Sequence, residues 1–118
     1  MSDRRDQDYL NDILEAMERI AEYISGLTCE GFMLDRKTQD AVIRNLEIIG
    51  EATKSLSPEL CRRHDEVPWS GLAGVRDKMI HYYFGLNYDV VWTIASQEIP
   101  ALLPAIRNIA EYEEEADT

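Results

Sequence analysis

The sequence predicts an all-α protein, an up-and-down bundle of helices with short connections. Three observations predict it: apolar residues recur at steps of three and four, only six glycines and four prolines occur among 118 residues, and no β-hairpin signal is visible. At this length we expect a single domain over residues 1–118, with a core that needs no disulfide or metal. The two cysteines form no disulfide framework, which favours a reduced, cytoplasmic protein.

Membrane association is not expected. The longest run without a charged residue covers ten positions, from Met79 to Tyr88. A bilayer span needs roughly 18–20 apolar residues, and the N-terminal segment has no apolar stretch of the kind that signal peptides carry.

The net charge of −11 is unevenly distributed along the chain. Residues 1–35 carry nine acids and three bases, residues 36–78 carry seven acids and eight bases, and residues 79–118 carry seven acids and one base. Broad electrostatic binding to nucleic acid requires a contiguous basic surface, which this distribution excludes. Any phosphate chemistry must therefore occupy a local site in the middle segment.

The first helix is expected over about residues 6–26, where an apolar stripe from Leu10 to Leu27 faces away from the acidic side chains and Gly26 ends the helix. A second helix should begin near Asp35, a good N-cap, and extend to about Leu56.

A short third helix should start at Ser57-Pro58, because proline suits the first turn of a helix, and residues 64–68 should form a loop. The fourth helix is expected to open at Trp69 and to carry Val75, Met79 and Ile80 inward.

Residues 85–88 should break the fourth helix, and Asp89 is a plausible start for a long fifth one. Pro100 and Pro104 lie inside that helix, so a kink is expected there. The acidic run from about residue 111 to 118 is expected to be a frayed, solvated tail.

The densest polar and aromatic stretch contains Arg76, His81 and Tyr83. Arginine suits a phosphate oxygen and histidine moves protons near neutral pH, so the pair could cleave a phosphodiester through an internal 2′-hydroxyl. On a continuous helix, however, five residues turn about 500° and leave Arg76 and His81 about 140° apart, whereas Tyr83 shares the Arg76 face. A second copy of the chain would resolve this separation. By spacing alone, a surface arginine and a hydrogen-bonded histidine are the simpler interpretation.

Two other chemistries are conceivable. Cys29, Cys61, His64 and His81 could be counted as zinc ligands, but they lack the second closely spaced ligand pair that structural zinc sites show. Cys61 could be a nucleophile only if His64 served as its base.

Asn45 and Glu51 lie on the second predicted helix. They could support a site, although helix packing or solvation is the simpler role for both residues.

The sequence resembles a known protein family. Arg76-x-x-x-x-His81-x-Tyr83 is similar to the Arg-x4-His-x-Tyr signature of the HepT toxins in the HEPN superfamily. The resemblance covers nearly the whole chain and includes four further blocks, in the same order as in the family: Tyr9-Leu10-x-Asp12-Ile13-Leu14, Arg44-Asn45-Leu46-Glu47-Ile48-Ile49-Gly50-Glu51-Ala52, Trp69-x-x-Leu72-Ala73-Gly74-Val75-Arg76, and His81-x-Tyr83-Phe84-Gly85 followed by Val91-Trp92.

The resemblance implies a helical homodimer with Arg76 and His81 of both subunits in a cleft at the interface. It implies a metal-independent ribonuclease without cofactors, a toxin paired with a minimal nucleotidyltransferase antitoxin that transfers AMP from ATP onto Tyr83. The family usually has a polar residue after the arginine, often asparagine; here it is Asp77, whose carboxylate could orient His81 but would weaken phosphate binding. The alternative is a non-catalytic helical dimer that serves only as partner and substrate of the nucleotidyltransferase.

Overall fold

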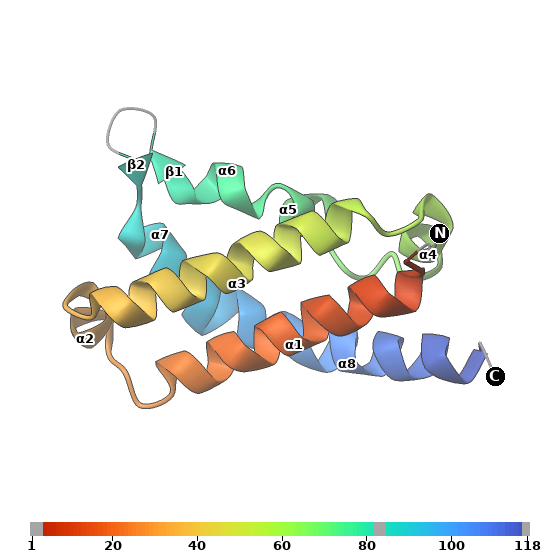
Figure 1. Ribbon diagram of the computed structural model, residues 1–118, viewed down its shortest axis with the longest axis horizontal. Helices are drawn as coiled ribbons and strands as arrows, with labels where there is room; N and C mark the ends of the chain where they lie inside the picture. Colours follow the sequence, from red (N-terminus) through yellow and green to blue (C-terminus); the bar gives the residue numbers. More distant parts are fainter. Residues whose placement is uncertain (1–3, 82–84, 117–118) are drawn as a thin grey trace.

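The computed structural model describes residues 4–81 and 85–116, with His81 described by its backbone alone. Long helices α1, α3 and α8 build the bundle, with α1 packed against both α3 and α8 (Figure 1). The all-α class is confirmed. The elements are α1 (Asp6–Ile24), α2 (Cys29–Met33), α3 (Arg36–Lys54), α4 (Pro58–Arg63), α5 (Trp69–Ala73), α6 (Val75–Met79), β1 (Ile80–His81), β2 (Gly85–Leu86), α7 (Tyr88–Thr93), a π-helical turn η1 (Ile94–Glu98) and α8 (Ile99–Ala116).

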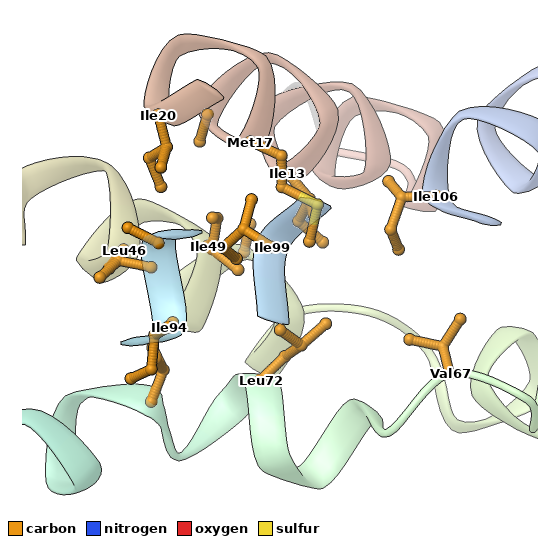
Figure 2. Close-up of a cluster of buried hydrophobic side chains, with 14 of the residues drawn as sticks. Ile13, Met17, Ile20, Leu46, Ile49, Val67, Leu72, Ile94, Ile99 and Ile106 are labelled. Atoms are coloured by element: carbon orange, nitrogen blue, oxygen red, sulfur yellow. The ribbon is translucent and has the colours of Figure 1, made fainter. Parts of the chain in front are cut away.

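The core is one apolar cluster into which helices from both halves of the chain point their side chains (Figure 2). Fully burying an aliphatic side chain of this size contributes roughly 1.5–3 kcal/mol relative to exposure. The residues that Figure 2 labels come from α1, α3, the segment before α5, α5, η1 and α8: Ile13, Met17, Ile20, Leu46, Ile49, Val67, Leu72, Ile94, Ile99 and Ile106. Among the helices described, none combines the length and the apolar character that a bilayer crossing requires.

The predicted first helix is confirmed as α1, and Gly26 follows its end with a left-handed φ of 79°. The helix start is fixed to a distant part of the chain: the Asp6 carboxylate accepts hydrogen bonds from the Ser57 backbone N–H at 2.9 Å and from its hydroxyl at 2.6 Å. Because Ser57 also caps α4, one carboxylate joins the beginnings of α1 and α4.

Asp35 caps α3 as predicted, since its carboxylate accepts the Thr38 backbone N–H at 3.0 Å. The preceding helix α2 was not predicted, because its five residues are too few to show a periodic pattern. It is held by the Thr28 hydroxyl, which accepts from the Gly31 N–H at 3.0 Å, and by buried Phe32, whose ring lies 5.3 Å from the ring of Trp92.

The prediction of one continuous fourth helix is wrong. The helix is interrupted at Gly74 between α5 and α6, and it ends at Met79. The chain then forms a two-residue antiparallel ladder in which Ile80 pairs with Leu86, although no hairpin was predicted. Met79, the last helical residue, is buried, whereas Ile80, the first extended residue, is 46% exposed, contrary to the inward position predicted for Ile80.

The fifth predicted helix is a succession of α7, η1 and α8. Asn87, rather than Asp89, caps its start by accepting the Val90 N–H at 3.2 Å. Where a kink was expected, a π turn closed by the Ile99 N–H on the Ile94 carbonyl stands immediately before Pro100, whereas α8 continues through Pro104. Proline cannot donate the helical bond at this point, so the wider turn lies where the regular α-helical pattern is broken.

The acidic C-terminal segment is helical through Ala116 and differs from the frayed tail expected. Glu113 accepts from Arg63 at 2.9 Å and lies 2.7 Å from Nε2 of His64. Its side chain is only 12% exposed. Burial raises the pKa of Glu113, but the hydrogen bonds from His64 and Arg63 outweigh it, so the net pKa lies below the ordinary value. These contacts attach the end of α8 to α4.

We expect Glu113→Gln to lower the free energy of unfolding by about 1–2 kcal/mol at pH 7, since it removes the charge from the hydrogen bonds that Arg63 and His64 make with this side chain. Because the pKa of Glu113 is lower in the folded protein, its carboxylate stabilises the fold at pH values above the unfolded-state pKa of about 4.3. This contribution to the free energy of unfolding disappears as the pH falls through the folded-state pKa. Urea unfolding at pH 7 and near pH 3 measures both effects. Glu114→Gln is the matched control, because it changes an exposed glutamate of the same helix. Equal stabilities of the two variants at pH 7 would contradict the attachment of α8 to α4 through Glu113.

Candidate functional site

Arg76 lies exposed on α6, in a groove of about 460 Å³ between the N-terminal turns of α1, the middle of α3 and the junction of α5 and α6. We call this the α3 groove. Four of its lining residues are basic, three are acidic and one is a tyrosine: Arg4, Arg44, Lys54 and Arg76; Asp12, Glu47 and Glu51; and Tyr9. Three of the four basic residues come from the middle segment, where the sequence predicted any phosphate site to be.

The position of Arg76 depends on Gly50. A Cβ atom at position 50 would lie 3.3 Å from Cγ1 of Val75 and 3.6 Å from the carbonyl oxygens of Leu72 and Ala73. The absence of a side chain at Gly50 therefore lets the α5–α6 junction rest directly on α3. From there α6 runs alongside α3 in the opposite direction (Figure 1), which brings Arg76 over the α3 groove.

The start of α5 is fixed independently of α3. Trp69 is buried, and its indole N–H donates to the His64 carbonyl oxygen at 2.8 Å. Since the Asp6–Ser57 pair holds the beginning of α4, the segment that carries Arg76 is anchored at both the helix before it and its own first turn.

The charges in the α3 groove do not cancel evenly. Arg4 pairs with Asp12 at 2.9 Å, and its guanidinium also lies over the Tyr9 ring, 4.8 Å from the centroid. Lys54 lies 3.6 Å from Glu51, a pair whose exposed side chains make it weak.

The two remaining cations of the groove are the guanidinium groups of Arg44 and Arg76. Within the described part of the chain neither forms an ion pair, and the remaining carboxylate is that of Glu47. The groove is thus a locally positive place on an acidic protein, and its shape and charge suit a phosphate group.

Of the other predicted site residues, the structure describes Asp77 in full. Asp77 is exposed on α6 next to Arg76 but does not line the α3 groove. The His81 side chain and all of Tyr83 lie outside the described residues. Because α6 ends at Met79 and the His81 backbone belongs to β1, the helical angles from which His81 and Tyr83 were placed relative to Arg76 do not apply.

Arg44 and the N-terminal turn of α1 were missed as parts of the site. A usable signal was present on α3, since Arg44 and Glu51 are seven residues apart and so share a helix face. Asn45, in contrast, is buried and donates to the Ala41 carbonyl oxygen at 2.9 Å, which is a packing role. Glu51 is exposed and lines the groove.

The cysteine chemistries find no support. Cys29 begins α2 and Cys61 lies in α4, at opposite ends of α3 (Figure 1). Among the side chains that the structure describes, no group of three or more histidine, cysteine or acidic residues is placed to hold a metal ion. Burial, followed by the charge of Asp6, raises the pKa of the Cys61 thiol, which is the opposite of what a nucleophilic cysteine needs.

Comparison with known proteins gives a consistent result. Residues 13–109 match the profile of a family described as "Ribonuclease HepT-like". A "Probable ribonuclease HepT" from Thermococcus cleftensis is 48% identical over 99 residues, which cover 84% of this chain and 90% of that protein. A provisionally named RNase from Methanocaldococcus jannaschii is 45% identical, covering 86% of this chain and 84% of the relative. Another from Caldanaerobacter subterraneus is 43% identical, covering 89% and 94%. No solved structure gives a significant match.

Proposed function

Because this chain belongs to the ribonuclease HepT-like family, we propose that it cleaves RNA without a metal ion and acts as the toxin of a toxin–antitoxin pair. The observation that carries the proposal is the position of Arg76, an exposed cation in the α3 groove that is followed five residues later by His81. Together the two side chains supply a fixed positive charge and a group that exchanges protons near neutral pH.

The proposed reaction is transesterification within the RNA. The 2′-oxygen attacks the adjacent phosphorus and loses its proton, while the bond from phosphorus to the 5′-oxygen breaks and that oxygen gains a proton. His81 acts as general base or acid in these transfers, and Arg76 stabilises the charge on the pentacovalent phosphate. The products are a 2′,3′-cyclic phosphate and a 5′-hydroxyl. Asp77, the neighbour of Arg76, would orient the imidazole of His81.

We further propose that two copies of the chain pair through the surface around β1, which would bring Arg76 and His81 of both subunits to one cleft. Ile80 supports this, because a large aliphatic side chain is 46% exposed within the motif that carries both residues. An exposed apolar residue is not unusual by itself, but its place between Arg76 and His81 is where a composite site would need contact.

Regulation by a minimal nucleotidyltransferase antitoxin is the remaining part of the proposal. Transfer of AMP to the hydroxyl of Tyr83 forms a phosphodiester with the tyrosine oxygen and releases pyrophosphate from ATP. The added phosphate would compete with RNA for Arg76 through a charge-assisted hydrogen bond. A dimer that is only modified and does not cleave RNA is the alternative outcome.

The dimer predicts a sedimentation mass of twice the 13.6 kDa chain at micromolar concentration. Ile80→Ser should weaken the dimer because it removes apolar contact area, whereas Leu34→Ser should not, although Leu34 is 89% exposed at the end of α2. A folded wild-type monomer at this concentration would exclude the composite cleft.

Arg76→Ala should reduce cleavage of RNA in the presence of a metal chelator by about 10²–10³-fold, and His81→Ala by about 10²–10⁴-fold. Arg76 is exposed, so its truncation leaves no core cavity and the unfolding midpoint should stay unchanged. Lys78→Ala is the matched control, another exposed cation on α6. Retained cleavage in either site variant, or metal-dependent cleavage, would refute the mechanism; the end groups of the products check the chemistry.

Co-expression with a cognate nucleotidyltransferase should add one adenylyl mass or more to the intact protein. Tyr83→Phe should abolish this gain because it removes the accepting hydroxyl, and Tyr82→Phe, one position earlier in the sequence, should retain it. Intact-mass spectrometry reports the result directly. Modification that persists in Tyr83→Phe would assign the AMP to another residue.

A further inference from the structure

Arg44 is an exposed cation that the proposed reaction does not use. It lies on the α3 face that forms the α3 groove, and no carboxylate of the described residues forms an ion pair with it. Arg4 and Lys54, in the same groove, do have such partners, at 2.9 Å on Asp12 and 3.6 Å on Glu51. Arg44 and Arg76 are thus the two basic residues of the α3 groove with which no carboxylate of the described residues forms an ion pair.

Arg44 and Arg76 line the same groove from two different helices. Arg44 precedes Gly50 by six residues, so it lies about 9 Å along α3 from the point where the α5–α6 junction rests. Because α6 runs antiparallel to α3, the chain moves from this contact toward the Arg44 end before it reaches Arg76 (Figure 1). Both guanidinium groups therefore line one groove, one from α3 and one from α6. Within the described residues, no carboxylate forms an ion pair with either group.

This pair of cations fits an extended phosphate backbone better than a single anion. Guanidinium groups bind phosphate oxygens through two parallel hydrogen bonds, and each long side chain can reach separately to its own phosphate. Glu47, also in the groove, repels anions near it, so a phosphate bound there depends on direct contact with a guanidinium group. A nucleic-acid strand offers a separate phosphate to each of the two side chains.

We propose that Arg44 binds a phosphate of the RNA strand next to the phosphate that reacts, and so holds the strand across the α3 groove while Arg76 contacts the reacting group. The inference rests on the proposed ribonuclease function, since RNA is the strand concerned. Arg44 then contributes to binding in both the ground state and the transition state, and it is not a catalytic residue. Contacts of this kind position a strand without reading its sequence.

The test uses the full chain and a short, mixed-sequence RNA whose riboses are all 2′-O-methylated, so that binding is measured by fluorescence anisotropy without cleavage. Arg44→Gln should raise the dissociation constant about tenfold at low salt and reduce the slope of log affinity against log salt by about 0.7, the value for one phosphate contact on a single strand. Arg44→Lys should recover part of the affinity because it keeps the charge. Arg36→Gln is the control, an exposed arginine on the same helix outside the groove.

Cleavage of the unmodified RNA separates this inference from the function on which it rests. Arg44→Gln should raise KM and change kcat little, in contrast to Arg76→Ala. Wild-type binding without cleavage would overturn the ribonuclease proposal and leave the Arg44 contact supported. Unchanged affinity and salt slope in Arg44→Gln, or an equal loss in Arg36→Gln, would overturn the Arg44 contact alone. A loss of dimer mass with intact RNA binding would assign Arg44 to a protein interface instead, and a wild-type protein that binds no RNA would overturn both proposals.

Discussion

The contact between Gly50 and the α5–α6 junction determines where the charged side chains of this protein can meet. The Cβ-free surface at Gly50 of α3 admits the Val75 side chain and two carbonyl oxygens at close range. From this contact α6 continues along α3, and Arg76 lines the α3 groove. Close backbone approach is a role that glycine alone fills without displacement of its neighbours.

The acidity of the chain has a structural use beyond solvation. Asp6 ties α1 to the start of α4, Glu113 ties α8 to the end of α4, and Glu18 of α1 accepts from Arg107 of α8 at 3.2 Å. Carboxylates thus connect the helices of the bundle from its surface, with partners that come from distant parts of the chain. The α3 groove differs because two of its four basic residues, both arginines, have no such partner among the described residues.

Most of the fold could be predicted from the sequence, because caps and apolar periodicity are local signals. Asp35, Ser57 and the stripe of α1 each mark an element that the structure confirms. The errors concern effects that depend on distant contacts. The interruption at Gly74 and the end of α6 at Met79 were not evident from the apolar spacing, and the contact of α5 and α6 with α3 is not visible in the local sequence. The helical end of α8 depends on Arg63 and His64, some 50 residues away.

The kind of candidate site could be predicted from the sequence, but only some of the residues that line it could be. Arg76 could be identified as a candidate from its chemistry and motif, whereas Arg44 looked like any exposed helix residue until the structure showed that both residues line the α3 groove. The angular relation of Arg76 to His81 failed for a physical reason: a helical wheel applies only while the helix continues, and here the backbone becomes extended before His81.

The π turn of η1 has a consequence for how this chain tolerates changes in length. A π turn holds about one residue more than an α turn, so the faces of α7 and α8 are offset by about 100° relative to an uninterrupted helix. Val91 before the turn and Ile99 and Ile106 after it are all buried with this offset. Loss of one exposed residue from this turn, such as Gln97, would let regular α-helix form and would keep the apolar side of α8 on α1, because the deletion removes the same 100° that the wider turn absorbs. The π turn therefore accommodates one additional residue, and the helices on either side of it stay aligned with the core whether that residue is present or not.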